Sequence, residues 1–80
     1  MTLEILTPEK KLYSGEATSV TLPGVDGSFQ ILNRHAPIIS ALGKGMIKYK
    51  TGSETKTLTI SGGFVENVKN KVIVLVEGVN

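Results

Sequence analysis

The sequence contains no cysteine and only one histidine. Without cysteine the chain cannot form a disulfide, an iron–sulfur site, a cysteine-based zinc site or a thiol nucleophile. One histidine is also too few for a multi-histidine metal site. Charge of one sign is scarce as well, because nine basic and seven acidic residues leave a net charge of +2. Nucleic-acid-binding proteins usually concentrate more positive charge than this on one face, so we expect no nucleic-acid partner.

Long hydrophobic runs are absent too. The longest, residues 72–76, is far shorter than the roughly 20 residues of a membrane-spanning helix. Residues 1–4 lack the basic start of a signal peptide. The 80 residues have room for one core, and the 40% of them that are hydrophobic are enough to form it. We therefore expect one soluble, intracellular domain over residues 1–80, with no direct membrane insertion.

What the sequence does contain favours β-structure. Val, Ile and Thr supply 23 residues, whereas Ala occurs only three times. β-Branched side chains suit the pleated surface of a sheet. Nine glycines divide the chain into short segments, as turns between strands do. No window of helical length shows an apolar stripe of helical period, and only residues 36–42 could form a turn of helix.

Alternating apolar and polar residues mark the individual strands. In residues 18–22, for example, Val20 and Leu22 fall on one face. In residues 71–76, apolar side chains occupy both odd and even positions, which predicts a strand buried on both faces. The Asp26-Gly27 pair predicts a hairpin turn. Eight or nine such strands in one flat sheet would expose a whole apolar face, so we predict an all-β fold: a two-layer β-sandwich or flattened barrel of about eight to ten short antiparallel strands.

Candidate catalytic residues are few. His35 is the one side chain that titrates near neutral pH without help from its surroundings. A hydrolase would use it as a general base for Ser40 or Ser61, but this also needs an orienting carboxylate and an oxyanion hole, which the spacing does not supply. The glycines of residues 43–45 and 61–63 lack the spacing of a phosphate-binding loop and are typical of turns. The sequence predicts no catalytic residue, cofactor or metal.

Evidence for a nucleic-acid-binding surface is weak. Lys48, Lys50 and Lys56 form one weak basic stripe on adjacent predicted strands. Single-strand binding also needs exposed aromatic side chains on which bases stack. The aromatic residues of the predicted strands are instead expected to face mostly inward; these are Tyr13, Tyr49 and Phe64.

Apolar residues outside the strands are more suggestive. Leu32 and residues 36–39 cluster around a proline-containing break in the strand pattern, and Val25 and Phe29 flank the predicted hairpin turn. Segments this apolar are either tucked under the sandwich or pressed against another protein. The pattern leaves both possibilities open.

Six motifs then occur in a fixed order along the chain. They are residues 12–16 (LYSGE), 20–24 (VTLPG), 26–27 (DG) with Phe29, 35–37 (HAP) with 40–42 (SAL), 45–47 (GMI) and 61–64 (SGGF). In this order and near these spacings they resemble the N-terminal β-sandwich domain of the epsilon subunit of the rotary ATP synthase, which is called delta in mitochondria. The resemblance covers essentially the whole chain. It implies a flattened barrel of ten strands and a non-catalytic subunit of an enzyme complex.

The resemblance also implies partners. In this family the subunit joins the gamma subunit to the ring of c subunits in the central stalk, and it helps to couple proton transport to ATP synthesis. The residues implied to face the c-ring lie in one loop: Gly27, Ser28, Phe29, Gln30 and Ile31. Those implied to face gamma are Thr7, His35, Ala36, Pro37, Ile38, Ile39 and Ser40.

Two single positions and one pair of residues depart from the family pattern. Ser28 stands where many relatives have an acidic residue, and Gln30 where many have glycine. Neutral hydrogen bonds and packing of Phe29 are therefore expected at the c-ring in place of a charged contact. The residues before His35 are Asn33 and Arg34, where relatives often have proline, and we expect a looser turn there.

Many family members continue into two helices that can inhibit ATP hydrolysis, whereas this sequence ends at Asn80. The expectation is a connector without the C-terminal helical hairpin, peripheral on the cytoplasmic side of a bacterial inner membrane. The alternative is a stand-alone β-sandwich or barrel that binds oligosaccharide or single-stranded nucleic acid. Such a module needs a groove lined by exposed Tyr or Phe, whereas a stalk subunit needs two protein-facing patches.

Overall fold

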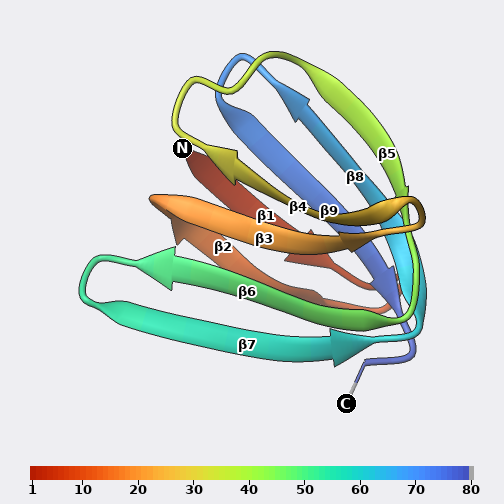
Figure 1. Cartoon of the computed structure of the whole chain (residues 1–80). Helices are drawn as coiled ribbons and strands as arrows, with labels where there is room; N and C mark the ends of the chain where they lie inside the picture. The colour runs from red at the N-terminus through yellow and green to blue at the C-terminus, as the bar shows by residue number, and fades with distance from the viewer. Residues whose placement is uncertain (80) are drawn as a thin grey trace.

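The computed structural model describes residues 1–79, which form nine strands (Figure 1). The strands are β1 (Thr2–Leu6), β2 (Lys11–Glu16), β3 (Ser19–Gly24), β4 (Gly27–Leu32), β5 (Ile38–Leu42), β6 (Gly45–Thr51), β7 (Glu54–Ile60), β8 (Gly62–Val68) and β9 (Lys71–Glu77). The all-β prediction is confirmed. Residues 36–42, which could have formed a helical turn, belong to β5 and the segment before it, because Ile38–Leu42 pairs along its length with β8. No helix that could cross a membrane is found in residues 1–79.

The strands form one curled sheet that folds over on itself into two layers (Figure 1). The strand order is β2-β1-β9-β8-β5-β3-β6-β7, and β4 pairs with β3 off this path. We call β2, β1, β9, β8 and β5 the first layer, and β4, β3, β6 and β7 the second layer. The predicted eight to ten strands are confirmed at nine, one fewer than the ten that the resemblance implied.

One pair departs from the predicted antiparallel arrangement. β1 and β9 are parallel, with Leu3 opposite Val72 and Ile5 opposite Val74, whereas all other pairs in the described residues are antiparallel. Alternation along a strand reports which side chains face the core but carries no information on the direction of its neighbour. The pair brings the two ends of the chain together in the middle of the first layer.

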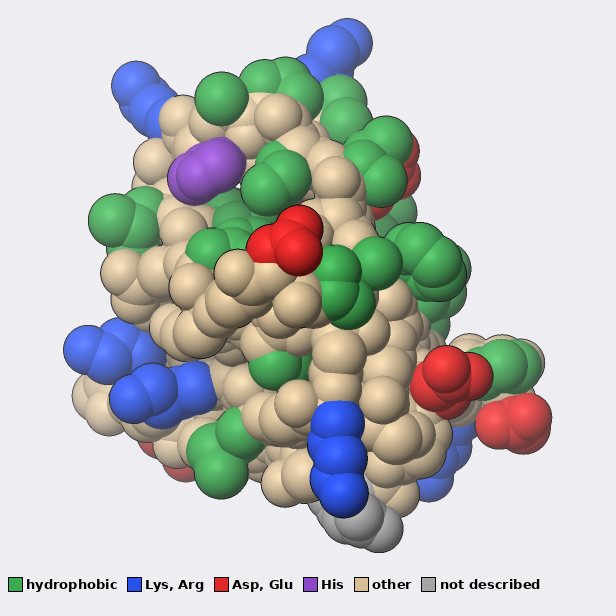
Figure 2. Space-filling model, turned by 45° about the vertical axis from the view of Figure 1, so that its right-hand side comes forward, with side chains coloured by type: hydrophobic (Ala, Val, Ile, Leu, Met, Phe, Trp, Pro, Cys, Tyr) green, Lys and Arg blue, Asp and Glu red, His purple; other side chains and the backbone are tan. Residues whose placement is uncertain are grey.

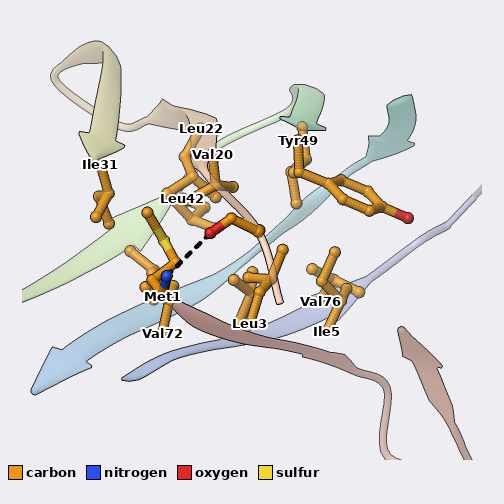
Figure 3. Packing of buried hydrophobic residues seen from close by; sticks show 14 of the residues in the cluster. Met1, Leu3, Ile5, Val20, Leu22, Ile31, Leu42, Tyr49, Val72 and Val76 are labelled. Atoms are coloured by element: carbon orange, nitrogen blue, oxygen red, sulfur yellow. Dashed lines mark hydrogen bonds between the residues drawn. The ribbon is translucent and has the colours of Figure 1, made fainter. Parts of the chain in front are cut away.

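The core lies between the two layers and is built from alternate positions of each strand (Figure 3). Leu3, Ile5 and Val74 of the first layer are fully buried, as are Val20, Leu22 and Ile47 of the second. The N-terminal residue closes one side of this core. Met1 is 5% exposed, and its ammonium group donates to the carbonyl oxygen of Ala17 at 3.0 Å.

Two inward predictions are wrong. Phe64 on β8 is 60% exposed and Leu75 on β9 is 51% exposed, so each of these neighbouring strands has one buried face and one open face. An apolar residue at every position of a strand predicts burial on both faces only where a second layer covers each of them. In this sandwich only the inner face of the first layer is covered.

Candidate protein-interaction surfaces

The residues expected to face the c-ring lie on β4, which pairs with β3 in a tight hairpin. A hairpin is found where the sequence predicted one, but its two-residue turn is Val25 and Asp26, one residue before the predicted Asp26-Gly27 pair, because Gly24 is opposite Gly27. Gly27 has a φ of 128°, which favours glycine there. The stretch expected to be a loop is therefore a strand, and its side chains alternate between the two faces of the second layer.

That alternation divides the predicted c-ring residues into two groups. Ser28 and Gln30 are exposed and point to the outside, and Gln30 lies opposite Thr21. Ile31 is 1% exposed and belongs to the core, and Phe29 is half-buried against it. Phe29 also lies over Gly24, because a Cβ added at Gly24 would stand 2.8 Å from its Cε1 atom. The outward-facing polar pair is the part of this set that a partner can reach.

The first part of the set expected to face gamma is the connection between β4 and β5. A turn closes this connection, because the backbone N–H of His35 donates to the carbonyl of Leu32 at 3.1 Å, and Arg34 adopts a positive φ of 64°. The His35 side chain is exposed, and its Nδ1 lies 2.7 Å from the carbonyl of Ala36, so this nitrogen carries the proton. Figure 2 shows His35 on the surface with hydrophobic side chains around it.

Two asparagines of the first layer hold this connection in place. Asn67 on β8 is 1% exposed, and its Nδ2 donates to the carbonyls of His35 at 3.1 Å and Ala36 at 3.2 Å. The Oδ1 of Asn70, in the turn between β8 and β9, accepts from the backbone N–H of Arg34 at 2.8 Å. The turn that was expected to be looser is therefore held to the first layer by three hydrogen bonds.

The rest of the set lies on β5 and at the end of β1. Ile39 points outward and is 75% exposed, whereas Ile38 and Ser40 are half-buried on the inner side. Thr7 follows β1, and its hydroxyl oxygen accepts from the backbone N–H groups of Glu9 and Lys10. Thr7 and His35 are at opposite ends of the first layer, because Leu6 aligns with Leu75 and, across β8, with Ala41.

An apolar surface on the outside of the first layer lies between these two ends. Leu6, Leu75, Phe64 and Ala41 are paired across four adjacent strands, and Ile73 and Ile39 flank Glu66 in the next row. We call this set the outer apolar face; it consists of Leu6, Ile39, Ala41, Phe64, Ile73 and Leu75. Phe64, Leu75 and Ile73 were not predicted as surface residues. Ile73 and Leu75 belong to the apolar run of residues 72–76, a pattern that predicts burial on both faces, and the aromatic ring of Phe64 was likewise expected to face inward.

The outer apolar face is shallow and has acidic neighbours. A pocket of about 210 Å³ lies between Ile39, Phe64, Glu66, Ile73 and Leu75, and a second of about 220 Å³ extends it toward Pro8 and Glu77. Glu4 lies opposite Ile73 and pairs with Lys11 at 3.5 Å. Shallow hollows rimmed by polar groups suit the side chains of another protein.

The outside of the second layer is different in chemistry. Lys48 is cross-strand to Thr21 and Thr57, and Lys50 is cross-strand to Thr55. The predicted basic stripe is incomplete, because Lys56 is opposite the buried Tyr49 and its ammonium lies 5.8 Å from the ring of Tyr13. A one-residue step along a strand changes the face, which is why lysines on adjacent strands need not share one.

The hydroxyl groups of the two serines considered for a hydrolase are hydrogen-bonded to backbone carbonyls. The hydroxyl of Ser40 donates to the carbonyl of Ala41 and that of Ser61 to the carbonyl of Glu77, each at 3.2 Å. His35 in turn contacts the carbonyl of Ala36. These contacts do not bring a base and a hydroxyl together. In residues 1–79 no three His, Asp or Glu side chains are grouped to hold a metal ion.

The tyrosines form a packed pair instead of a ligand platform. Their ring centroids are 5.0 Å apart and tilted by 49°, and Tyr49 is 7% exposed. Burial raises the pKa of Tyr49 above 10.0, and repulsion from Tyr13 raises it further. The oligosaccharide or single-strand alternative needs a groove lined by exposed aromatic rings. Phe64 is the exposed large aromatic side chain among the described residues, and aliphatic side chains surround it.

Comparison with known proteins identifies the family. The chain matches the model of the ATP synthase Delta/Epsilon chain β-sandwich domain over residues 1–80, and it belongs to this family. It is 45% identical over 75 residues to the ATP synthase epsilon chain of Maridesulfovibrio salexigens and 44% identical over 79 residues to that of Chlorobium limicola. These alignments cover 94% and 98% of this chain.

The relatives differ in length. The chain spans 53% of the Maridesulfovibrio relative and 90% of the Chlorobium relative. Among solved structures, it is similar to a chain of the Tetrahymena thermophila mitochondrial ATP synthase central stalk and c-ring, with a TM-score of 0.84, 22% identity and coverage of 99% of this chain and 64% of that one. A chain of the Euglena gracilis mitochondrial ATP synthase gives a TM-score of 0.88 at 20% identity, with coverage of 98% and 51%. These likenesses show the fold.

Proposed function

We propose that this protein is a central-stalk subunit of a rotary proton-translocating ATP synthase, where it links the gamma subunit to the c-ring and helps to couple proton transport to ATP synthesis. It acts as a non-catalytic connector over residues 1–80, one epsilon-type β-sandwich domain. The observation that carries the proposal is the outer apolar face, which joins the two separated parts of the set expected to face gamma, Thr7 and residues 35–40.

Gamma binds across the first layer in this proposal. Ile39, Phe64 and Leu75 are each more than half exposed and form the centre of the contact. Burying such side chains against a partner is favourable by roughly 25 cal/mol for each Å² of apolar surface removed from water. A surface this apolar at the centre with acidic residues at its edge has the anatomy of a protein–protein interface.

The c-ring binds at the β3–β4 hairpin. Ser28 and Gln30 point outward from β4, and the turn at Val25 and Asp26 is exposed beside them. In this proposal, Ser28 and Gln30 form neutral hydrogen bonds to the polar loops of the c-ring. Phe29 supports the hairpin from within, because it packs on the core and on Gly24.

The location follows from the partners. A subunit held between gamma and the c-ring is part of a membrane-associated complex without entering the bilayer itself. We propose that it lies on the cytoplasmic side of a bacterial inner membrane. Its two-layer sheet suits a rotor part, since a sandwich closed around a packed core resists bending.

An affinity pull-down with this chain as bait from membranes of its own source tests the proposal. We expect the gamma subunit and c-ring to be retained by the wild-type chain. Ile39→Asp places a charge on the outer apolar face, at a side chain that is 75% exposed, and should abolish retention of gamma. Met46→Asp is the matched control, because Met46 is 56% exposed on the second layer. Failure to retain any synthase subunit, or equal loss with both variants, would contradict the proposal.

A further inference from the structure

We infer that Asn67 and Asn70 are positioning residues that hold the connection between β4 and β5 in the conformation that faces the partner. This inference rests on the proposed function, because it assigns the connection to the gamma interface. The two side chains make three hydrogen bonds to backbone groups of Arg34, His35 and Ala36. They therefore fix the main chain of the segment, whatever side chains it carries.

The side chain of Asn67 is buried and cannot contact a binding partner directly. It is 1% exposed and lies on the inner face of β8, cross-strand from Ile38 on one side and Val72 on the other. Its Nδ2 makes both of its hydrogen bonds to the connection, while its buried Oδ1 has no donor among the described residues. An apolar side chain would suit such a core position better for stability. What asparagine provides at this position is two hydrogen bonds that hold the carbonyl groups of His35 and Ala36 in place.

Asn70 completes the arrangement from the neighbouring turn. Lys69 and Asn70 have φ values of 52° and 60°, the conformation of a tight hairpin turn between β8 and β9. Its Oδ1 reaches the backbone N–H of Arg34, which has a positive φ of 64° and is therefore held in a strained conformation. Asn67 and Asn70 thus form hydrogen bonds to consecutive residues of the connection, 34–36, from the same side.

The arrangement also ties the two proposed interfaces together. The connection runs from β4, which carries the outward-facing Ser28 and Gln30, to β5, which carries Ile39. A connection free to move would have to be ordered when the partner binds, and the apparent affinity falls by the fraction of molecules in the competent conformation. The two asparagines remove that cost before the encounter.

Two variants separate positioning from stability. Asn67→Leu keeps the branched shape of the side chain while removing its donors and its orphaned acceptor, so we expect the urea midpoint to stay equal or rise. Affinity for purified gamma, measured by calorimetry, should fall about five- to twentyfold because the segment loses two hydrogen bonds. Asn70→Gly keeps a residue that tolerates positive φ and removes only the contact to Arg34.

Amide hydrogen exchange on the isolated chain gives a readout independent of the partner. We expect faster exchange at His35 in Asn67→Leu and at Arg34 in Asn70→Gly. Tyr13→Phe is the matched control, because it removes a side-chain bond to a backbone carbonyl, that of Glu16 at 2.8 Å, far from the connection. It should leave both exchange at these amides and affinity unchanged.

The outcomes distinguish this inference from the proposed function. If wild-type chain fails to bind gamma, the proposed function fails, while the exchange data still report whether the asparagines order the connection. If both asparagine variants exchange and bind like wild type, the positioning inference is overturned even though gamma binds. A fall in affinity matched by an equal fall in stability would also overturn it, since that result needs only a structural role.

Discussion

Phe64 on β8 and Leu75 on β9 lie directly opposite each other, and both side chains point away from the core. They are 60% and 51% exposed in a chain whose inner positions on the same strands, Val65 and Val74, are buried at 1% and 0%. This pair is the centre of the outer apolar face.

Replacing Phe64 and Leu75 separately by Ala should weaken binding to gamma by about 1–3 kcal/mol each, the range of central interface residues. The free energy of unfolding should change by less than about 0.5 kcal/mol, because neither side chain is in the core. Calorimetric titration and urea unfolding measure the two quantities. Met46→Ala serves as the control on the second layer; if it weakens binding as much, the first layer is not the contact surface.

The two isoleucines assigned to different partners should behave oppositely in stability. Ile31 is 1% exposed and Ile39 is 75% exposed. Ile31→Ala should lower the free energy of unfolding by about 2–5 kcal/mol through the cavity it leaves, whereas Ile39→Ala should change it by less than about 0.5 kcal/mol. Urea titration of both variants decides this. Equal destabilisation would mean that β4 or β5 packs differently.

Retention of the c-ring should depend on the outside of β4. Ser28→Trp places a bulky ring on the exposed face of the hairpin, so it should reduce c-ring retention strongly while gamma retention persists. Thr57→Trp introduces the same side chain on β7 of the same layer and is the control. Loss of both partners with Ser28→Trp would indicate misfolding or a shared surface, and an unchanged c-ring would remove β4 from that interface.

Gly24 should not tolerate even a methyl group. A Cβ there would lie 2.7 Å from the carbonyl oxygen of Gly27 and 2.8 Å from Phe29. Gly24→Ala should therefore cost about 1–3 kcal/mol by displacing Phe29 or opening the hairpin. In contrast, Gly52 has no atom within 4 Å of its added Cβ and a φ of 63°, so Gly52→Ala carries backbone strain alone. Thermal unfolding measures the loss of stability in each variant. Near-UV circular dichroism, to which tryptophan does not contribute in this chain, shows whether the surroundings of Phe29 change in Gly24→Ala and stay the same in Gly52→Ala.

Stability at high pH should depend on Tyr49. Burial, and then repulsion from Tyr13, raise the pKa of Tyr49 above 10.0 in the folded state. The folded chain thus holds this proton more tightly than the unfolded chain, so the contribution to stability is complete below the unfolded pKa and is lost as the pH rises through the folded pKa. The difference in unfolding free energy between wild type and Tyr49→Phe should be constant at neutral pH and shift against wild type above about pH 10. A difference that does not vary with pH would contradict the raised pKa.

Local chemistry in the sequence predicted much of the fold. Alternation predicted that Val20 and Leu22 face inward, and the Asp26-Gly27 pair predicted the hairpin between β3 and β4 to within one residue of its turn. Both signals act over a few residues, where the two-residue period of a strand and the conformational freedom of glycine are sufficient. The order of the motifs identified the family, which the comparison confirms.

The candidate surfaces were predicted less well, because exposure depends on what covers a strand. The unbroken apolar run of residues 72–76 in β9 carries the same pattern whether a second layer covers both faces or one, and Leu75 is exposed because one face is open. Asn67 likewise reads as a polar residue in a strand. Its burial and its hold on His35 depend on β5 and β8 being neighbours.

The strand-rich fold class, the approximate places of the turns and the family can be predicted from the amino-acid sequence, since they follow from side-chain period, backbone freedom and motif order. Tertiary packing decided that β1 and β9 run parallel and that Phe64 and Leu75 face outward. It also decided that two asparagines distant in sequence fasten the connection before β5. These features depend on which strands become neighbours and which face remains uncovered, and neither is encoded within a single strand.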